Sequence, residues 1–146
     1  PRSGSTMNDD IPTLRRILRE NHVIAVVGLS ANWYRPSYFA AKYMMEHGYT
    51  VIPINPGLAG QSIHGVEVKA SLADAGPVDM VDIFRNSVAA GAVVDEAIAA
   101  GAKAVWMQLG VVNEEAAARA EAAGLKVVMD HCPKIEIARL GLEKVA

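Results

Sequence analysis

The residues best suited to chemistry lie in five short segments, each directly after a run of apolar residues. The segments are Gly28–Ser37, Asn55–Gly57, Phe84–Asn86, Gln108–Val111 and Asp130–Pro133. In the first, Gly28 follows an apolar run, and Arg35 and Ser37 lie where a helix is expected to start. Backbone N–H groups at a helix start attract anions, and a guanidinium suits a phosphate. This segment therefore predicts a phosphate-binding loop, with a long surface loop and a solvated Arg35 as the alternative.

The nucleotide motifs that this loop could represent are incomplete. Ser30 stands where the dinucleotide pattern G-x-G-x-x-G has its second glycine, and no G-x-x-x-x-G-K-[ST] pattern occurs. At the second segment, an NAD site usually has an acidic residue for the ribose, whereas this chain has Asn55 and Pro56. The neutral pair disfavours NAD and leaves room for a phosphorylated ribose. Turn chemistry is the simpler alternative for Asn-Pro.

The remaining three segments offer a cation, an amide and a thiol. An aromatic and a cation, Phe84 and Arg85, can flank an adenine or a phosphate, and Gln108 and Gly110 are expected at the same ligand edge. Cys132 precedes a predicted helix, where the pKa of a thiol can be lowered, although a single cysteine is usually an inert apolar residue. A nucleophilic pair with His131 is disfavoured because adjacent side chains rarely face one another.

Other chemical signals are weak in this sequence. The four histidines are dispersed without metal-ligand spacing, and neither a G-x-S-x-G elbow nor a glutamate–histidine helix motif occurs. Asp79 and Asp82 flank a predicted strand, where we expect capping or solvation. We therefore predict no catalytic residue and no metal site.

The elements that must position these segments alternate between apolar strands and alanine-rich helices. Strands are predicted at 23–27, 50–54, 79–84, 104–108 and 126–129, with a short strand edge or helical turn at 68–75 and a loop at 55–66. Helices are predicted at 11–20, 37–47, 86–100, 114–123 and 134–140. This order predicts a single α/β domain, a doubly wound parallel sheet of about five strands between two helix layers, with ligands at the carboxyl ends of the strands.

Composition narrows the class of protein. The 146 residues suit one domain, and the formal charge of −2 without a basic cluster gives no support for nucleic acid or an anionic membrane as partner. Apolar runs such as Val23–Val27 are far shorter than the ~20 residues that span a bilayer. One cysteine excludes an internal disulfide and fits a reducing, cytoplasmic location.

The chain is expected to divide into three parts. Residues 1–6 precede Met7, show no periodicity and are interpreted as a remnant of an expression vector. Residues 7–22 hold an amphipathic helix, with Ile11, Leu14, Ile17 and Leu18 on one face, that is expected to cover one end of the sheet. Residues 23–146 form the ligand-binding domain.

With these residues in place, the chain resembles the small stand-alone CoA-binding proteins, which are related to the N-terminal domain of the succinyl-CoA synthetase α subunit. The matching segments are Val26–Ser30, Arg35–Ser37, Gly48–Pro56, Val81–Arg85, Ala102–Glu114 and Gly124–Cys132. Trp106–Gly110 and its surroundings are the most specific part. The resemblance does not extend to the second domain of the synthetase or to its phosphohistidine, so ligase activity is not expected.

The resemblance implies a Rossmann-like fold with coenzyme A laid across the carboxyl ends of the strands. Gly28, Leu29 and Ser30 would contact the nucleotide phosphates, with further phosphate contacts from Arg35 and Ser37. Asn55 and Pro56 would line the adenosine or phosphate region, and Phe84 and Arg85 the adenine or diphosphate wall. Gln108 and Gly110 would lie along the pantetheine arm. Cys132 would either meet the CoA thiol as a mixed disulfide or belong to the core.

Three classes of function follow from these observations. The first is a non-catalytic module that binds CoA or an acyl-CoA as a carrier, sensor or regulatory partner. The second is a small NAD(P)- or CoA-dependent enzyme, or a subunit that needs a partner chain. The third is an interaction protein that kept the fold and lost the site. A homodimer formed through the N-terminal helix is also compatible with the sequence.

Overall fold

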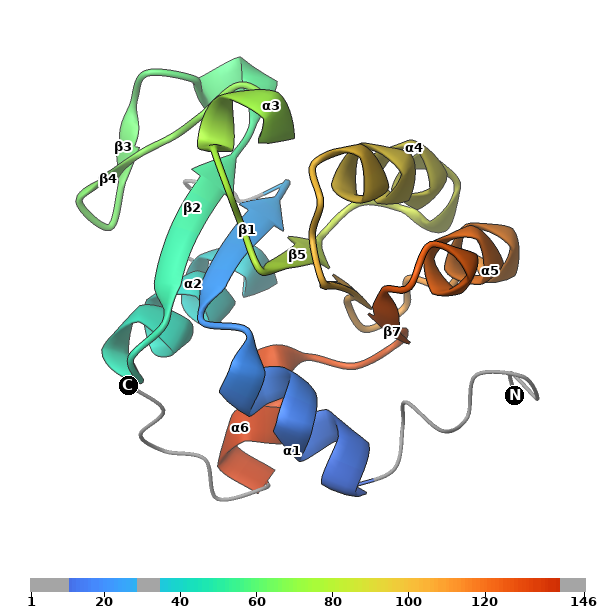
Figure 1. Ribbon diagram of the computed structural model, residues 1–146. Coiled ribbons are helices and arrows are strands. Elements are labelled where there is room, and N and C mark those ends of the chain that lie inside the picture. Colours follow the sequence, from blue (N-terminus) through green and yellow to red (C-terminus); the bar gives the residue numbers. More distant parts are fainter. Residues whose placement is uncertain (1–10, 29–34, 140–146) are drawn as a thin grey trace.

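The computed structural model describes residues 11–28 and 35–139 and confirms the predicted α/β fold. Five strands form one sheet in the order β2-β1-β5-β6-β7, and every neighbouring pair is parallel (Figure 1). The strands are β1 (Val23–Val27), β2 (Thr50–Ile54), β5 (Met80–Ile83), β6 (Ala104–Met107) and β7 (Lys126–Val128). The helices are α1 (Ile11–Glu20), α2 (Pro36–Glu46), α3 (Leu72–Ala75), α4 (Ser87–Ala99), α5 (Glu114–Ala122) and α6 (Pro133–Arg139).

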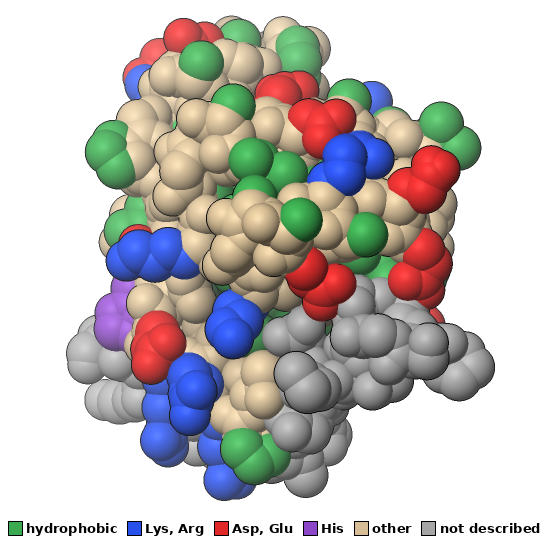
Figure 2. Space-filling model, turned by 45° about the vertical axis from the view of Figure 1, so that its right-hand side comes forward, with side chains coloured by type: hydrophobic (Ala, Val, Ile, Leu, Met, Phe, Trp, Pro, Cys, Tyr) green, Lys and Arg blue, Asp and Glu red, His purple; other side chains and the backbone are tan. Residues whose placement is uncertain are grey.

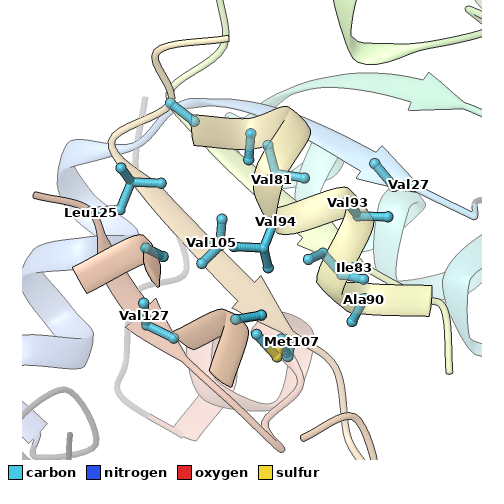
Figure 3. Packing of buried hydrophobic residues seen from close by; sticks show 14 of the residues in the cluster. Val27, Val81, Ile83, Ala90, Val93, Val94, Val105, Met107, Leu125 and Val127 are labelled. Atoms are coloured by element: carbon cyan, nitrogen blue, oxygen red, sulfur yellow. The ribbon is translucent and has the colours of Figure 1, made fainter. Parts of the chain in front are cut away.

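Helices cover both faces of the sheet, because successive strand residues point to opposite sides and both sides are apolar. On one face, Val81 and Ile83 of β5 pack with Val93 and Val94 of α4 and with alanines of α5 (Figure 3). On the other face, Met80 joins a second cluster with residues of α1, α2 and α6. Figure 1 shows α4 and α5 together on one side and α1 and α6 on the other.

The N-terminal helix α1 belongs to this second face. Leu14, Ile17 and Leu18 are fully or almost fully buried in the cluster that also contains Ile137 of α6. The apolar face predicted from the helical spacing is therefore used within the chain, and a dimer through it stays a prediction. Within residues 11–28 and 35–139, no helix is both long and apolar enough to cross a membrane.

Asparagine side chains cap the starts of α4 and α5. The Asn86 side chain accepts from the Ala89 N–H and starts α4, and Asn113 does the same for Ala116 at α5. At α2, Ser37 is not the capping residue, because Arg35 holds the N-cap position and makes no side-chain cap hydrogen bond. The helix begins one residue earlier than predicted, at Pro36, whose fixed φ suits the first helical position, and Ser37 is buried inside the first turn.

The segment predicted as a loop at 55–66 contains more structure than expected. It holds the 3-10 helix η2 (Pro56–Leu58) and an antiparallel hairpin of β3 (Ser62–Ile63) and β4 (Val66–Glu67). His64 and Gly65 both have positive φ, at 53° and 80°, as a two-residue hairpin turn requires. The strand edge predicted near 68 is a single bridge between Ile54 and Lys69. Two-residue strands are too short to show a periodicity in the sequence.

The sheet order reverses between β1 and β5. The chain passes from β1 to β2 on one side and then returns to β5 on the other side of β1. In open parallel sheets, the crevice at such a switch point, beyond the carboxyl ends of the strands, is where ligands bind. The residues that directly follow β1 and β5, Gly28 and Phe84–Arg85, lie at this point.

Candidate functional site

The backbones that leave β1 and β5 approach each other closely at Gly28. Gly28 has a φ of +89°, and a Cβ placed on it would lie 2.6 Å from the Phe84 carbonyl oxygen and 3.1 Å from Arg85 Cδ. Its N–H donates to the Ile54 carbonyl at 2.9 Å, which also ties it to β2. Both the positive φ and the contact exclude any other residue without local rearrangement. The glycine therefore keeps the Arg85 side chain against the end of β1.

A cavity of about 500 Å³ opens beside this point. It is bounded by the start of α2, by the segments that follow β5 and β6, and by the segment from the end of β7 into α6. The residues that line it are Pro36, Phe39, Phe84, Arg85, Gln108, Leu109, Val111, Cys132 and Ile135. Among the described lining residues Arg85 is the charged one, and it lies at the edge of an apolar surface.

Gln108 is the polar residue of the cavity wall, and one of its atoms has no partner. The residue follows β6 and is only 6% exposed. Its backbone N–H donates to the Ile83 carbonyl at 3.2 Å, but the side-chain Oε1 is buried without a hydrogen bond. Leaving a buried acceptor unpaired costs about 1–3 kcal/mol. An amide held in this state at a cavity wall is suited to a ligand that brings an N–H or O–H donor.

The loop between β7 and α6 is held by the Trp106 side chain of β6 and by Asp130 of the loop itself. Asp130 has a φ of 61° and accepts from the Gly110 N–H at 2.7 Å. The Trp106 indole Nε1 donates to the His131 carbonyl at 2.9 Å. Because both bonds connect the β6 and β7 ends, they position Cys132, which is buried except where it lines the cavity.

The His131 side chain contacts α6, the helix that follows it. Its Nδ1 lies 3.4 Å from a carboxylate oxygen of Glu136, which is itself buried. The free thiol in the part of the chain that the structure describes, Cys132, thus has a neighbour whose ring contacts a carboxylate. Among these residues there is also no group of three or more His, Cys, Asp or Glu that could hold a metal ion.

The structure brings some of the predicted site residues together and separates others. Phe84, Arg85, Gln108 and Cys132 line the cavity, and Gly28 lies against the first two. Arg35 is exposed just before α2, whereas Ser37 is buried within that helix. Gly110 donates to Asp130, and Asn55 accepts from the Gly57 N–H at 2.9 Å as the N-cap of η2 that Pro56 begins. Leu29 and Ser30 lie outside the described residues.

Sequence reasoning missed the apolar wall of the cavity. Leu109 is 55% exposed and lines the cavity with Phe39 and Ile135. A signal for Phe39 was present, because the buried positions of α2 are Ser37, Ala40, Ala41 and Met44. An aromatic residue off that buried face is a candidate for ligand contact.

The expectation that Asp82 is capped or solvated is wrong. Asp82 is fully buried in the middle of β5, in register with Val26 on one side and Trp106 on the other. Neither carboxylate oxygen has a hydrogen-bond partner, and burial raises the pKa of this carboxyl well above its usual range. Since the side chain occupies a position that alternation assigns to the core, its polarity carries a cost in stability.

Asp79 behaves as the capping residue that was expected. Partial burial acts to raise its pKa, but hydrogen bonds from the Val23 and His22 N–H groups and the nearby Lys103 prevail and lower it. The two N–H donors lie 3.0 and 3.1 Å from the carboxylate. This carboxylate therefore holds the start of β1 at the edge opposite to the cavity.

A second depression, of about 460 Å³, lies at that opposite edge. Its lining includes Arg16, Lys103 and Lys126 together with Glu20 and Asn21. Several basic side chains gather at the lower left of the face drawn in Figure 2, while acidic side chains dominate its right-hand side. This depression is far from the predicted ligand segments in the chain topology and serves below as the location of a control variant.

Comparison with known proteins places the chain in a family. A family model described as a CoA binding domain matches residues 22–138. The protein YneT of Bacillus subtilis (strain 168) is 38% identical over 123 residues, which is 84% of this chain and 90% of the relative. A solved structure from Thermus thermophilus, cell-free ID.343, is 36% identical with a TM-score of 0.85, covering 90% of this chain and 98% of that one.

A further structure is similar in fold alone. The dinucleotide-forming acetyl-coenzyme A synthetase 1 of Ca. Korarchaeum cryptofilum is 24% identical with a TM-score of 0.65, and the match covers 78% of this chain and 27% of the synthetase. The family model, by contrast, extends from just before β1 to the end of α6 and includes every described residue of the cavity. The chain belongs to the CoA-binding domain family.

Proposed function

We propose that this protein binds coenzyme A at the carboxyl ends of β1, β5 and β6 and acts as a non-catalytic binding, carrier or regulatory module. The observation that carries the proposal is the unpartnered Oε1 of Gln108 in the wall of a cavity that opens beside Gly28 and Arg85. Coenzyme A supplies a partner for both groups: its phosphates for Arg85, and the amide N–H donors of its pantetheine arm for Gln108 Oε1.

The residues present fit this ligand in chemical type. Arg85 supplies the positive charge for a phosphate, and Gly28 allows the backbones after β1 and β5 to approach each other closely beside Arg85. Gln108 Oε1 would accept from a pantetheine amide. Arg35 and Ser37, with Leu29 and Ser30, would add phosphate contacts, and Asn55 and Pro56 would line the adenosine region. Gly110 and Cys132 would lie near the thiol end of the arm.

A non-catalytic role is supported by what lines the cavity. Among the described lining residues there is no carboxylate and no histidine, so general acid–base groups are absent from the wall. Cys132 is the single nucleophilic group, and its neighbour His131 contacts Glu136. Intact-mass spectrometry after incubation with acetyl-CoA tests the enzymatic alternative, since an acyl adduct on Cys132 would replace the binding module by an acyl-transfer catalyst.

Titration calorimetry tests the proposal directly. We expect CoA to bind, 3′-dephospho-CoA to bind more weakly, and ATP and NADH to bind least. Arg85→Ala should weaken CoA binding by about 10- to 150-fold, as expected for a charge-assisted hydrogen bond of ~1.5–3 kcal/mol. Lys126→Ala removes one positive charge at the opposite edge and should leave the affinity unchanged. Equal losses in both variants would mean that only net charge matters.

Gln108→Leu tests the observation on which the proposal depends. The substitution removes the acceptor for the amide and should weaken CoA binding by at least about fivefold, the lower end for an unpaired buried donor. It should not lower the free energy of unfolding, because it also removes a buried atom that has no partner. Unchanged CoA affinity in a folded Gln108→Leu variant would exclude the proposed amide contact.

A further inference from the structure

The cavity has more apolar lining than free coenzyme A would cover. Seven of the nine lining residues are apolar, namely Pro36, Phe39, Phe84, Leu109, Val111, Cys132 and Ile135. The remaining two, Arg85 and Gln108, are the ones that a phosphate and a pantetheine amide would use. A free CoA thiol leaves most of this surface without an apolar partner, so the ligand is expected to bring more hydrocarbon.

The apolar surface is concentrated in side chains that face solvent. The described residues include five large hydrophobic side chains that are exposed, and three of them line this cavity: Phe39 at 43%, Leu109 at 55% and Ile135 at 49%. They come from α2, the segment after β6, and α6. Exposed apolar patches shared by separate elements mark binding surfaces more often than chance exposure does.

The order of the strands sets the direction in which a ligand would lie along the cavity, which is called the groove below. Arg85 follows β5, Gln108 follows β6, and Cys132 and Ile135 follow β7, which is the next strand along the edge. A ligand with phosphates at Arg85 and an amide at Gln108 would carry its sulfur toward Leu109, Cys132 and Ile135. The lining residues that the structure describes beyond the sulfur position are apolar.

From this arrangement we infer that the ligand is a fatty acyl thioester of coenzyme A, whose hydrocarbon chain lies in the groove between Phe39 and Ile135. The inference rests on the proposed CoA site and names the form of ligand that the site prefers. The polar end of the groove accounts for the CoA moiety, and the exposed side chains account for the acyl chain. A second copy of this chain seated on the same patch is the competing occupant.

A series of ligands with increasing chain length tests the inference. Calorimetry would compare CoA with acetyl-, butanoyl-, hexanoyl- and octanoyl-CoA, all below their micelle concentrations. A fully buried methylene raises affinity by about fourfold, and an open groove buries only part of each. We expect octanoyl-CoA to bind at least about tenfold more tightly than acetyl-CoA.

Matched variants locate the acyl chain. Phe39→Ser and Ile135→Ser change side chains that are half exposed, and each should weaken the binding of octanoyl-CoA more than it weakens the binding of free CoA. Val88→Ser changes a side chain that is 88% exposed and does not line the cavity, and it should leave the advantage intact. Circular dichroism verifies that all three variants fold.

The outcomes distinguish the acyl-CoA inference from the proposed CoA-binding function on which it rests. If CoA and octanoyl-CoA bind equally, the acyl inference is overturned and the CoA proposal stands. If no CoA compound binds, the proposed function fails first. Sedimentation velocity covers the competing occupant: a dimer that Phe39→Ser dissociates, together with no chain-length effect, would show that a second copy covers the patch and would overturn the inference.

Discussion

Replacing the buried Asp82 by asparagine should weaken the pH dependence of stability that we expect of the wild-type protein. The Asp82 carboxyl is fully buried between Val26 and Trp106 and has no hydrogen-bond partner, so desolvation disfavours its charged form. The folded protein therefore retains a proton at this group at pH values where the unfolded chain has released it. Asparagine has a similar shape and does not titrate.

The sign and size of the effect follow from proton linkage. The pKa of Asp82 is raised on folding, so its contribution to stability is complete below the unfolded pKa of about 3.9 and is lost as the pH rises toward the folded pKa. Within that window the folded state binds more protons than the unfolded state. The free energy of unfolding should fall by up to about 1.4 kcal/mol for each pH unit.

Urea unfolding followed by tryptophan fluorescence, from pH 5 to pH 8, measures this slope. The wild-type free energy of unfolding should decline with pH, while that of Asp82→Asn should decline less by up to the same 1.4 kcal/mol per unit. Asp79→Asn is the control. Because the pKa of Asp79 is lowered, its contribution is constant above about pH 4, and this variant should parallel the wild type at lower stability. Parallel profiles for wild type and Asp82→Asn would refute the reasoning and mean that water or a partner reaches the carboxyl.

Substitutions at three further positions test local contacts by urea unfolding. Asp130→Gly should lower the free energy of unfolding by about 1 kcal/mol, because the hydrogen bond to the Gly110 N–H is lost. Asp130→Ala should lower it by about 1 kcal/mol more, because alanine disfavours the backbone φ of 61°. Equal losses in the two variants would exclude a contribution from backbone conformation. Trp106→Phe should cost at least about 1–3 kcal/mol, since the buried indole no longer donates to the His131 carbonyl. Asn113→Ala should cost about 1 kcal/mol through loss of the α5 cap; no change would mean that water replaces the cap.

The layers of the fold could be predicted from the sequence because its signals agree with one another. Continuous apolar runs such as Val23–Val27 predict strands buried on both faces, and the observed sheet covers both faces with helices. Asn86 and Asn113 stand where capping requires them. Local preference and tertiary packing thus favour the same structure, and the element order leaves few topologies for a parallel sheet.

The parts that could not be predicted depend on contacts between distant residues. The hairpin of β3 and β4 has two residues in each strand. His64 adopts a positive φ that was not predicted from its residue type. The cavity wall combines Phe39, Leu109 and Ile135 from three elements that are far apart in the sequence. Asp82 was misread because a carboxylate normally indicates an exposed position, and only the strand register reveals that it is in the core.

The unpartnered side-chain oxygens of Asp82, in β5, and Gln108, directly after the neighbouring strand β6, carry different implications for function. Both residues leave polar oxygens without hydrogen bonds and so lower stability, and such departures from good packing are expected near functional sites. Only Gln108 lines the cavity, whereas Asp82 is fully enclosed. A ligand in the cavity would lie against the Gln108 residue, whereas Asp82 does not belong to the lining. Gln108→Leu should therefore weaken CoA binding without loss of stability, while Asp82→Asn should change the pH dependence of stability and leave CoA affinity at pH 7 unchanged. A loss of CoA affinity in Asp82→Asn would instead show that the buried carboxyl is connected to the cavity, and the boundary of the site would have to include the interior of β5.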